Sequence, residues 1–95
     1  MGENSDAGVV RQLLIPLKPF LSDPNLYEVV INRPGEVLTE GTTGWQRYEL
    51  PDLSFDKLMR LARAVASFSN QGIDETRPLL SATLPDDERI QIVIP

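Results

Sequence analysis

Two tight turns separate three short runs of alternating residues between positions 27 and 50, and this pattern constrains the fold more than any other part of the sequence. The first turn is Pro34-Gly35, within the stretch VVINRPGEVLTE, and the second is GTTG. Proline presets the backbone for a turn, and glycine tolerates the left-handed conformations that tight hairpins use. Runs joined by turns this short pair with their neighbours in antiparallel fashion. The sequence therefore predicts a meander with strands at 27–31, 36–40 and 45–50.

A helical pattern precedes this meander. Apolar residues recur at spacings of three and four over residues 9–21, and Asp6 is the expected N-cap. Pro16 and Pro19 interrupt the pattern, because a proline inside a helix removes a backbone hydrogen bond. The segment is therefore either a kinked helix or two short pieces, the second starting at Pro16. Residues 1–7 are expected to form a flexible tail.

A second helix and two more strands follow the meander. The stretch LPDLSFDKLMRLARAVASFSNQG is the clearest helix of the chain, with Ser54 at its N-cap and Gly72 at its end. Strands are expected at 79–84 and 88–94, joined by Pro85-Asp86-Asp87. The predicted fold is α+β, in the order α-β-β-β-α-β-β. It has a mainly antiparallel sheet of about five strands, with two helices packed on it.

The composition excludes several classes of function. Nine Lys+Arg against fourteen Asp+Glu give a net charge of −5, which argues against nonspecific nucleic-acid binding and hinders docking on an anionic membrane. The chain has no Cys and no His, so it lacks thiolate chemistry, the commonest metal ligand and the commonest general base at neutral pH. We expect no metal site and no self-contained enzyme. With neither a signal peptide nor an apolar run near the ~20 residues of a membrane span, a cytoplasmic protein is expected.

Three residues at two places in the sequence stand out as candidates for recognising an anion or a partner. Arg89 lies where the predicted strand 88–94 starts, directly after an acidic turn. It is either a surface ion-pair partner of Glu88 or Asp86, or a guanidinium directed at an anion on the domain edge. Asn32 and Arg33 raise a second question, because the Pro-Gly turn that follows them does not require an amide and a guanidinium at its mouth.

Arg60 and Arg63 lie on or beside the wetter face of the second predicted helix, where the ordinary interpretation is a solvated surface.

Phosphate binding by a glycine-rich loop and nucleophilic catalysis by serine have weaker support. No GxxxxGK[ST] phosphate loop is present, and the glycines of GTTG are too close together and precede a strand. The serines have no base to activate them.

Three stretches together resemble a known family. EVVINRPGEVLTE, LARAVASFSNQ and RPLLSATLPDDERIQIVIP occur in this order, and the similarity covers residues 9–95. They resemble the N-terminal domain of the hexameric traffic ATPases of type IV secretion and conjugation systems. The resemblance implies that residues 8–95 form a non-catalytic domain, and that a C-terminal domain carries the Walker motifs. Six subunits would form a two-layered ring that powers substrate transport or apparatus assembly.

The same resemblance implies roles for single residues. Arg89, in DDERIQ, would reach the nucleotide phosphates, and Asn32 would lie near the same cleft. Arg33, Arg60 and Arg63 are candidates for an interface. The implied cofactor is ATP with Mg, held by the catalytic domain and not tightly by this chain.

The implied partners are the C-terminal ATPase domain, neighbouring subunits of a homo-hexamer and other secretion components, without direct nucleic-acid contact. The implied location is cytoplasmic, peripheral at the inner face of the inner membrane.

This sequence departs from the family pattern in two respects. Asp87 stands where the family often has Gly, so a different backbone shape is expected there. The sequence also ends at Pro95 without Walker motifs, so the chain alone should not hydrolyse ATP.

Two alternatives remain open at this point. Helices packed on an antiparallel sheet also describe PAS-like ligand sensors, which need an apolar cavity with convergent polar groups. A protein-interaction adaptor would instead bind a partner through an exposed sheet edge or a helix groove.

Overall fold

The computed structural model describes residues 2–94, and the side chains from Ala7 to Ile94. In chain order the elements are α1 (Gly2–Leu13), the 3₁₀ helix η1 (Ile15–Leu17), α2 (Lys18–Leu21), β1 (Leu26–Ile31), β2 (Glu36–Gly41), β3 (Gly44–Glu49), α3 (Phe55–Phe68), β4 (Leu79–Thr83) and β5 (Arg89–Val93). The predicted α+β class and the order of helices and strands are confirmed.

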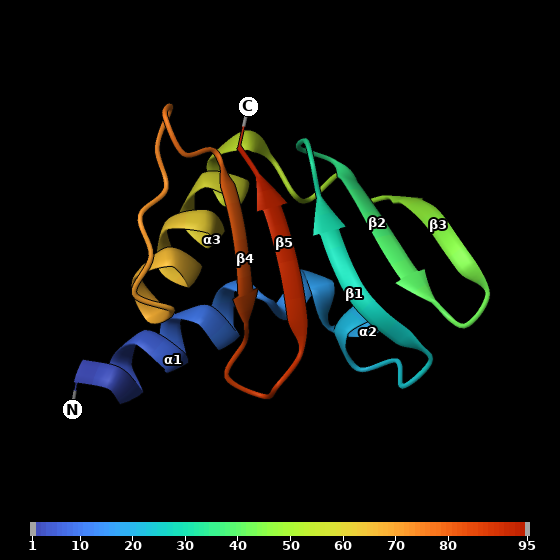
Figure 1. Ribbon diagram of the computed structural model, residues 1–95, viewed down its shortest axis with the longest axis horizontal. Coiled ribbons are helices and arrows are strands. Elements are labelled where there is room, and N and C mark those ends of the chain that lie inside the picture. Colours follow the sequence, from blue (N-terminus) through green and yellow to red (C-terminus); the bar gives the residue numbers. More distant parts are fainter. Residues whose placement is uncertain (1, 95) are drawn as a thin grey trace.

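The five strands form one sheet in the order β3-β2-β1-β5-β4 (Figure 1). The pairs β1–β2, β2–β3 and β4–β5 are antiparallel, as the short turns predict. The central pair, β1 and β5, is parallel, with Val29 opposite Ile90. The last strand therefore inserts between the first strand and β4, and it joins the meander to the C-terminal hairpin.

The helices cover one face of the sheet, and α2 reaches β3, where the ring centroids of Phe20 and Tyr48 lie 5.0 Å apart. Figure 1 shows α3 behind β4 and β5, with α1 crossing near the lower ends of the strands. All six residues of β3 are exposed. The core lies between the helices and the central strands, and its fully buried side chains include Val10, Leu14, Leu17, Val29, Ile31, Val37, Leu58, Leu61, Val65, Leu80, Ile90 and Ile92.

The two prolines divide the N-terminal helical segment, as one of the two interpretations predicted. Helix α1 ends at Leu13, Pro16 lies in the first turn of η1, and Pro19 lies in the first turn of α2. Proline is tolerated in a first turn because the N–H it lacks has no helical partner there. The expected N-cap at Asp6 is wrong, because α1 begins at Gly2 and no proline interrupts it before Leu13. Residues 2–7, expected to be a tail, are thus helical, and residue 1 lies outside the described residues.

Helix α3 begins as predicted, but it ends at a different residue from the one predicted. Ser54 is the N-cap, and its hydroxyl accepts a backbone N–H of the first turn at 3.3 Å. The predicted stop at Gly72 is wrong, because Asn70 takes the left-handed conformation with φ of 58°. The N–H of Gln71 then donates to the carbonyl of Ala66 at 2.8 Å, as in a Schellman motif. Asparagine tolerates this backbone better than most residues, which explains how the helix stops before its glycine.

Candidate functional site

Arg89 follows a tight turn with a left-handed residue at its end. The N–H of Asp87 donates to the carbonyl of Leu84 at 3.0 Å, and the N–H of Leu84 donates to the carbonyl of Glu88 at 2.7 Å. Asp87 has a φ of 70°. This is the pattern of a three-residue hairpin loop, in which glycine usually occupies the left-handed position. The expectation that Asp87 would change the backbone here is wrong, because Asp87 adopts the conformation that favours glycine.

We expect Asp87→Gly to raise the free energy of unfolding by about 0.5 kcal/mol. Glycine removes the strain of the left-handed backbone, and its greater freedom in the unfolded chain offsets part of this gain. Asp87→Val should lower the free energy of unfolding by about 1–2 kcal/mol, because β-branched residues fit this backbone worst. Urea unfolding of the three proteins measures both changes. Equal stabilities of the Gly and Val variants would contradict the assigned conformation.

Three ion pairs brace this turn against the N-terminal helices. Arg11 of α1 contacts both carboxylate oxygens of Asp86, at 3.1 and 3.3 Å. Lys18 of α2 lies 3.9 Å from Asp86 and 3.9 Å from Glu88. The hydrogen bond from Arg11 is the main reason that the pKa of Asp86 is lowered from its usual value. These contacts link the turn before Arg89 to α1 and α2.

The lowered pKa of Asp86 predicts how this contact responds to acid. Because the folded-state pKa is depressed, the contact contributes stability above the unfolded pKa of about 3.9, and this contribution is lost as pH falls through the folded-state pKa. Carboxyl NMR shifts should show Asp86 still ionised when the pH reaches its ordinary pKa. In Arg11→Ala the midpoint should rise toward the ordinary value. An identical midpoint in both proteins would show that Arg11 does not hold the carboxylate in solution.

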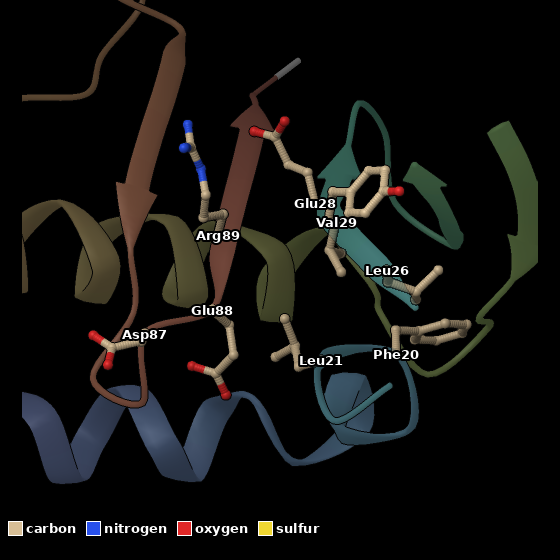
Figure 2. A pocket seen from close by; sticks show the side chains of 9 residues that line it. Phe20, Leu21, Leu26, Glu28, Val29, Asp87, Glu88 and Arg89 are labelled. Atoms are coloured by element: carbon tan, nitrogen blue, oxygen red, sulfur yellow. The ribbon is translucent and has the colours of Figure 1, made fainter. Parts of the chain in front are cut away.

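Arg89 takes no part in these ion pairs. Asp86 and Glu88, its two expected partners, are contacted by Arg11 and Lys18 instead. Among the side chains of residues 7–94, no carboxylate lies within ion-pair distance of Arg89. Figure 2 shows its side chain extending away from Asp87 and Glu88. The interpretation of Arg89 as an ordinary surface ion pair with these neighbours is therefore wrong.

A small pocket opens beside Arg89 where α2 meets the sheet (Figure 2). Its volume is about 180 Å³, below the roughly 300–1,000 Å³ of most small-molecule sites. Apolar side chains of α2 and β1 line one part of it, and charged residues line the other. The full lining is Phe20, Leu21, Leu26, Tyr27, Glu28, Val29, Asp87, Glu88 and Arg89. One guanidinium among three carboxylates can contact an anion held elsewhere, but it does not make a nucleotide site. Within residues 7–94 no group of three or more carboxylates is placed to hold a metal ion.

Asn32 lies away from Arg89 within this chain. The two strands are parallel, so the pairing of Val29 with Ile90 sets Glu28 opposite Arg89 at the beginning of β5. Asn32 follows the end of β1, four residues beyond Glu28, which corresponds to roughly 13 Å along the strand. Asn32 is exposed and lies at the opposite end of this strand pair. A ligand at Arg89 would therefore have to be extended to reach Asn32 as well.

Arg33 is part of a charge cluster within its own hairpin. Its Nε lies 3.3 Å from a carboxylate oxygen of Glu36, and Arg47 of β3 donates a hydrogen bond to the other oxygen. Glu36 is only 6% exposed, so its carboxylate needs these partners. The sequence interpretation missed the pairing of Glu36 with Arg47. The signal was available, because the two lie diagonally across the β2–β3 hairpin, within reach of long side chains.

Arg60 and Arg63 are both exposed on α3, as predicted for a wetter helix face. The structure adds a feature that the sequence interpretation did not include. Both arginines border an apolar groove between α1 and α3, whose lining also includes Val9 and Leu13. This groove lies on the helix layer, away from the edge at Arg89.

Comparison with known proteins identifies the family. No family model matches the sequence. The VirB11 protein of a Bartonella henselae type IV secretion system is 58% identical over 87 residues, covering 92% of this chain and 24% of that protein. The chain therefore belongs to the VirB11 family, as a homologue of one part of its members. The resemblance inferred from the sequence motifs is confirmed.

Further relatives agree with this assignment. VirB11 of Brucella suis is 50% identical over 89 residues, and the type IV secretion protein PtlH of Bordetella pertussis is 46% identical over 79 residues. The crystal structure of the Brucella suis VirB11 ATPase in complex with sulphate covers 99% of this chain with a TM-score of 0.84 and 46% identity. The chain spans about a quarter of the length of these VirB11 relatives. Within residues 2–94, no helix is long and apolar enough to cross a membrane.

Proposed function

We propose that this chain is the N-terminal, non-catalytic domain of a type IV secretion ATPase and that it caps the nucleotide site of an adjoining P-loop domain. Its similarity to VirB11 proteins supports the family, and its coverage of about a quarter of their length leaves room for a catalytic domain. The main support for the capping role is the environment of Arg89. This guanidinium is exposed, its turn is braced by Arg11 and Lys18, and no carboxylate of residues 7–94 neutralises it.

In this proposal Arg89 contacts phosphate oxygens of ATP bound in the adjoining domain. ATP with Mg supplies the phosphoryl group and is held there, since this chain has no GxxxxGK[ST] loop. A guanidinium binds phosphate through two parallel hydrogen bonds, and these strengthen where water is excluded. Because charge on the phosphoryl group is redistributed during transfer, a fixed cation at this place favours the reaction.

Assembly belongs to the same proposal. The domain would form one layer of a homo-hexameric ring, contacting its own ATPase domain, neighbouring subunits and other secretion components. We also propose a cytoplasmic location, peripheral at the inner face of the inner membrane, as the resemblance to type IV secretion ATPases implies. Since the chain carries a net charge of −5, we expect protein contacts to contribute more than lipid contacts to such an association. A stand-alone ligand sensor is less well supported, because the VirB11 relatives are secretion proteins.

The gene itself provides the first test. If the proposal holds, the coding sequence continues beyond Pro95 into a segment with the GxxxxGK[ST] pattern. A stop codon directly after Pro95 would overturn the proposal, because this chain has no phosphate loop of its own.

The 95-residue chain alone should bind ATP weakly, with a Kd above about 1 mM. One guanidinium beside a pocket of about 180 Å³ cannot offset the cost of ordering a nucleotide. Isothermal titration calorimetry with ATP and Mg is the measurement. A Kd in the low micromolar range would show that the chain contains a complete nucleotide site, which would contradict a capping role.

A further inference from the structure

The groove between α1 and α3 is larger than the pocket beside Arg89. Its first part has a volume of about 790 Å³ and is lined by Gly8, Val9, Gln12, Leu13, Arg60, Arg63 and Ala64. A second part of about 340 Å³ is lined by Gln12, Leu13, Ile15, Pro16, Leu53, Lys57 and Arg60. The two parts share Gln12, Leu13 and Arg60, so they form one continuous groove along both helices.

The groove has an apolar floor that the chain does not cover. Val9 is 52% exposed at one end, and Ile15 is 55% exposed at the other. Leu13 and Ala64 lie between them, half-buried. Scattered exposed apolar residues are ordinary, but a contiguous set inside a groove marks a binding surface.

One edge of the groove is positively charged. Lys57, Arg60 and Arg63 occur at every third position of α3, so they lie on one side of that helix. No carboxylate of residues 7–94 forms an ion pair with any of them. The whole chain has a net charge of −5, so this row of three cations makes the edge of the groove locally positive. Such an edge attracts an acidic partner and repels a basic one.

We propose that this groove binds an amphipathic helix of a partner protein, with an apolar stripe flanked by Asp or Glu. Apolar residues at i, i+3 or i+4, and i+7 would cover the floor from Val9 to Ile15, as in other helix-in-groove complexes. Acidic residues beside that stripe would pair with Lys57, Arg60 and Arg63. The surface is separate from the Arg89 edge, so this inference goes beyond the capping role and can fail without it.

Charge favours a protein helix over a lipid surface as the occupant. A membrane would meet the whole helix layer, and the net charge of −5 opposes its approach. A single helix contacts only the groove and its basic edge, where the local charge is favourable. The apolar floor lies between two helices, which also fits a cylinder better than a plane.

The test uses fluorescence anisotropy with the 95-residue chain and a pair of synthetic helical peptides of about 16 residues, roughly 24 Å long. The probe has Leu at i, i+3, i+7 and i+10 with flanking Glu, and its matched control has Lys in place of every Glu. The Glu peptide should bind at least about tenfold more tightly than the Lys peptide. The double variant Arg60→Glu/Arg63→Glu should lose about tenfold or more in affinity for the Glu peptide. Arg77→Glu, a charge reversal at an exposed arginine outside the groove, should leave the affinity unchanged.

Several results would overturn the proposal. It fails if the Glu peptide binds no better than the Lys peptide, or if the double and Arg77 variants behave alike while circular dichroism shows both folded. Pelleting of the chain with phosphatidylglycerol vesicles, lost in the double variant, would assign the groove to a lipid surface. If sedimentation shows that the wild-type chain is a dimer and the double variant a monomer, the groove binds a second copy of the chain instead. Amide NMR shifts on adding the Glu peptide should change at Val9, Leu13 and Ala64 and not in β3.

Discussion

Replacing Arg89 with alanine in the full-length protein is expected to lower the rate of ATP hydrolysis about tenfold or more, as the loss of a charge-assisted phosphate contact does in comparable sites. Lys18, the cation on the same side of the fold, lies beside Asp86 and Glu88. Steady-state ATPase measurements at saturating ATP, with the oligomeric state checked in parallel, give the effect on kcat.

Two further variants make this experiment specific. Arg89→Lys keeps the charge and loses the planar fork, so it should fall between the wild type and the alanine variant. Arg77→Ala removes an exposed arginine from the loop between α3 and β4 and should leave the rate unchanged. If Arg89→Ala hydrolyses ATP at the wild-type rate in an intact oligomer, Arg89 does not contact the nucleotide during the reaction.

Replacing Gly41 with alanine is expected to lower the free energy of unfolding by about 3 kcal/mol, out of the roughly 5–10 kcal/mol of a domain this size. An added Cβ would lie 2.8 Å from Cδ2 of Leu26 and closer still to the backbone carbonyl oxygen of Asn25. That carbonyl accepts the N–H of Thr42 at 3.0 Å, so moving it away costs a hydrogen bond. Urea unfolding of the 95-residue chain measures the loss.

Gly8 provides the matched control for this substitution. A Cβ added there meets nothing within 4 Å, and Gly8 lies inside α1. Gly8→Ala should therefore raise the free energy of unfolding by about 0.5–1 kcal/mol, because alanine favours the helix. A cost below about 1 kcal/mol for Gly41→Ala would show that β1 and β2 do not approach each other this closely.

The local parts of the fold could be predicted because they depend on neighbouring residues. The turns at Pro34-Gly35 and GTTG determine the meander, and the strands end within one residue of their predicted limits. Ser54 caps α3 through its own hydroxyl. The N-terminal segment divides at its prolines for an equally local reason, since proline lacks the N–H that a helix interior needs.

The long-range parts of the fold could not be predicted in this way. The parallel pairing of β1 with β5 joins residues about 60 positions apart, and no turn links them. The stop of α3 at Asn70 was missed because Gly72 is the stronger local signal, although the αL position falls two residues earlier.

The candidate site also combines features that depend on neighbouring residues with features that depend on distant ones. Arg89 was identified from the motif that contains it, but its lack of an ion-pair partner depends on Arg11 and Lys18, which lie more than 70 residues away in sequence. The amide and guanidinium before Pro34-Gly35 now have different explanations. Arg33 pairs with the buried carboxylate of Glu36, and Asn32 lies exposed at the far end of β1. The role of Asn32 in a nucleotide cleft stays a prediction.

A structure of the full-length protein with a non-hydrolysable ATP analogue and Mg tests the capping role most directly. The guanidinium of Arg89 should lie within about 3.2 Å of a phosphate oxygen, with the nucleotide held mainly by the P-loop domain. The turn at Asp86 should still be paired with Arg11, because that contact links the turn before Arg89 to α1. A nucleotide bound with Arg89 more than about 6 Å away, too far even for one bridging water, would contradict the proposal.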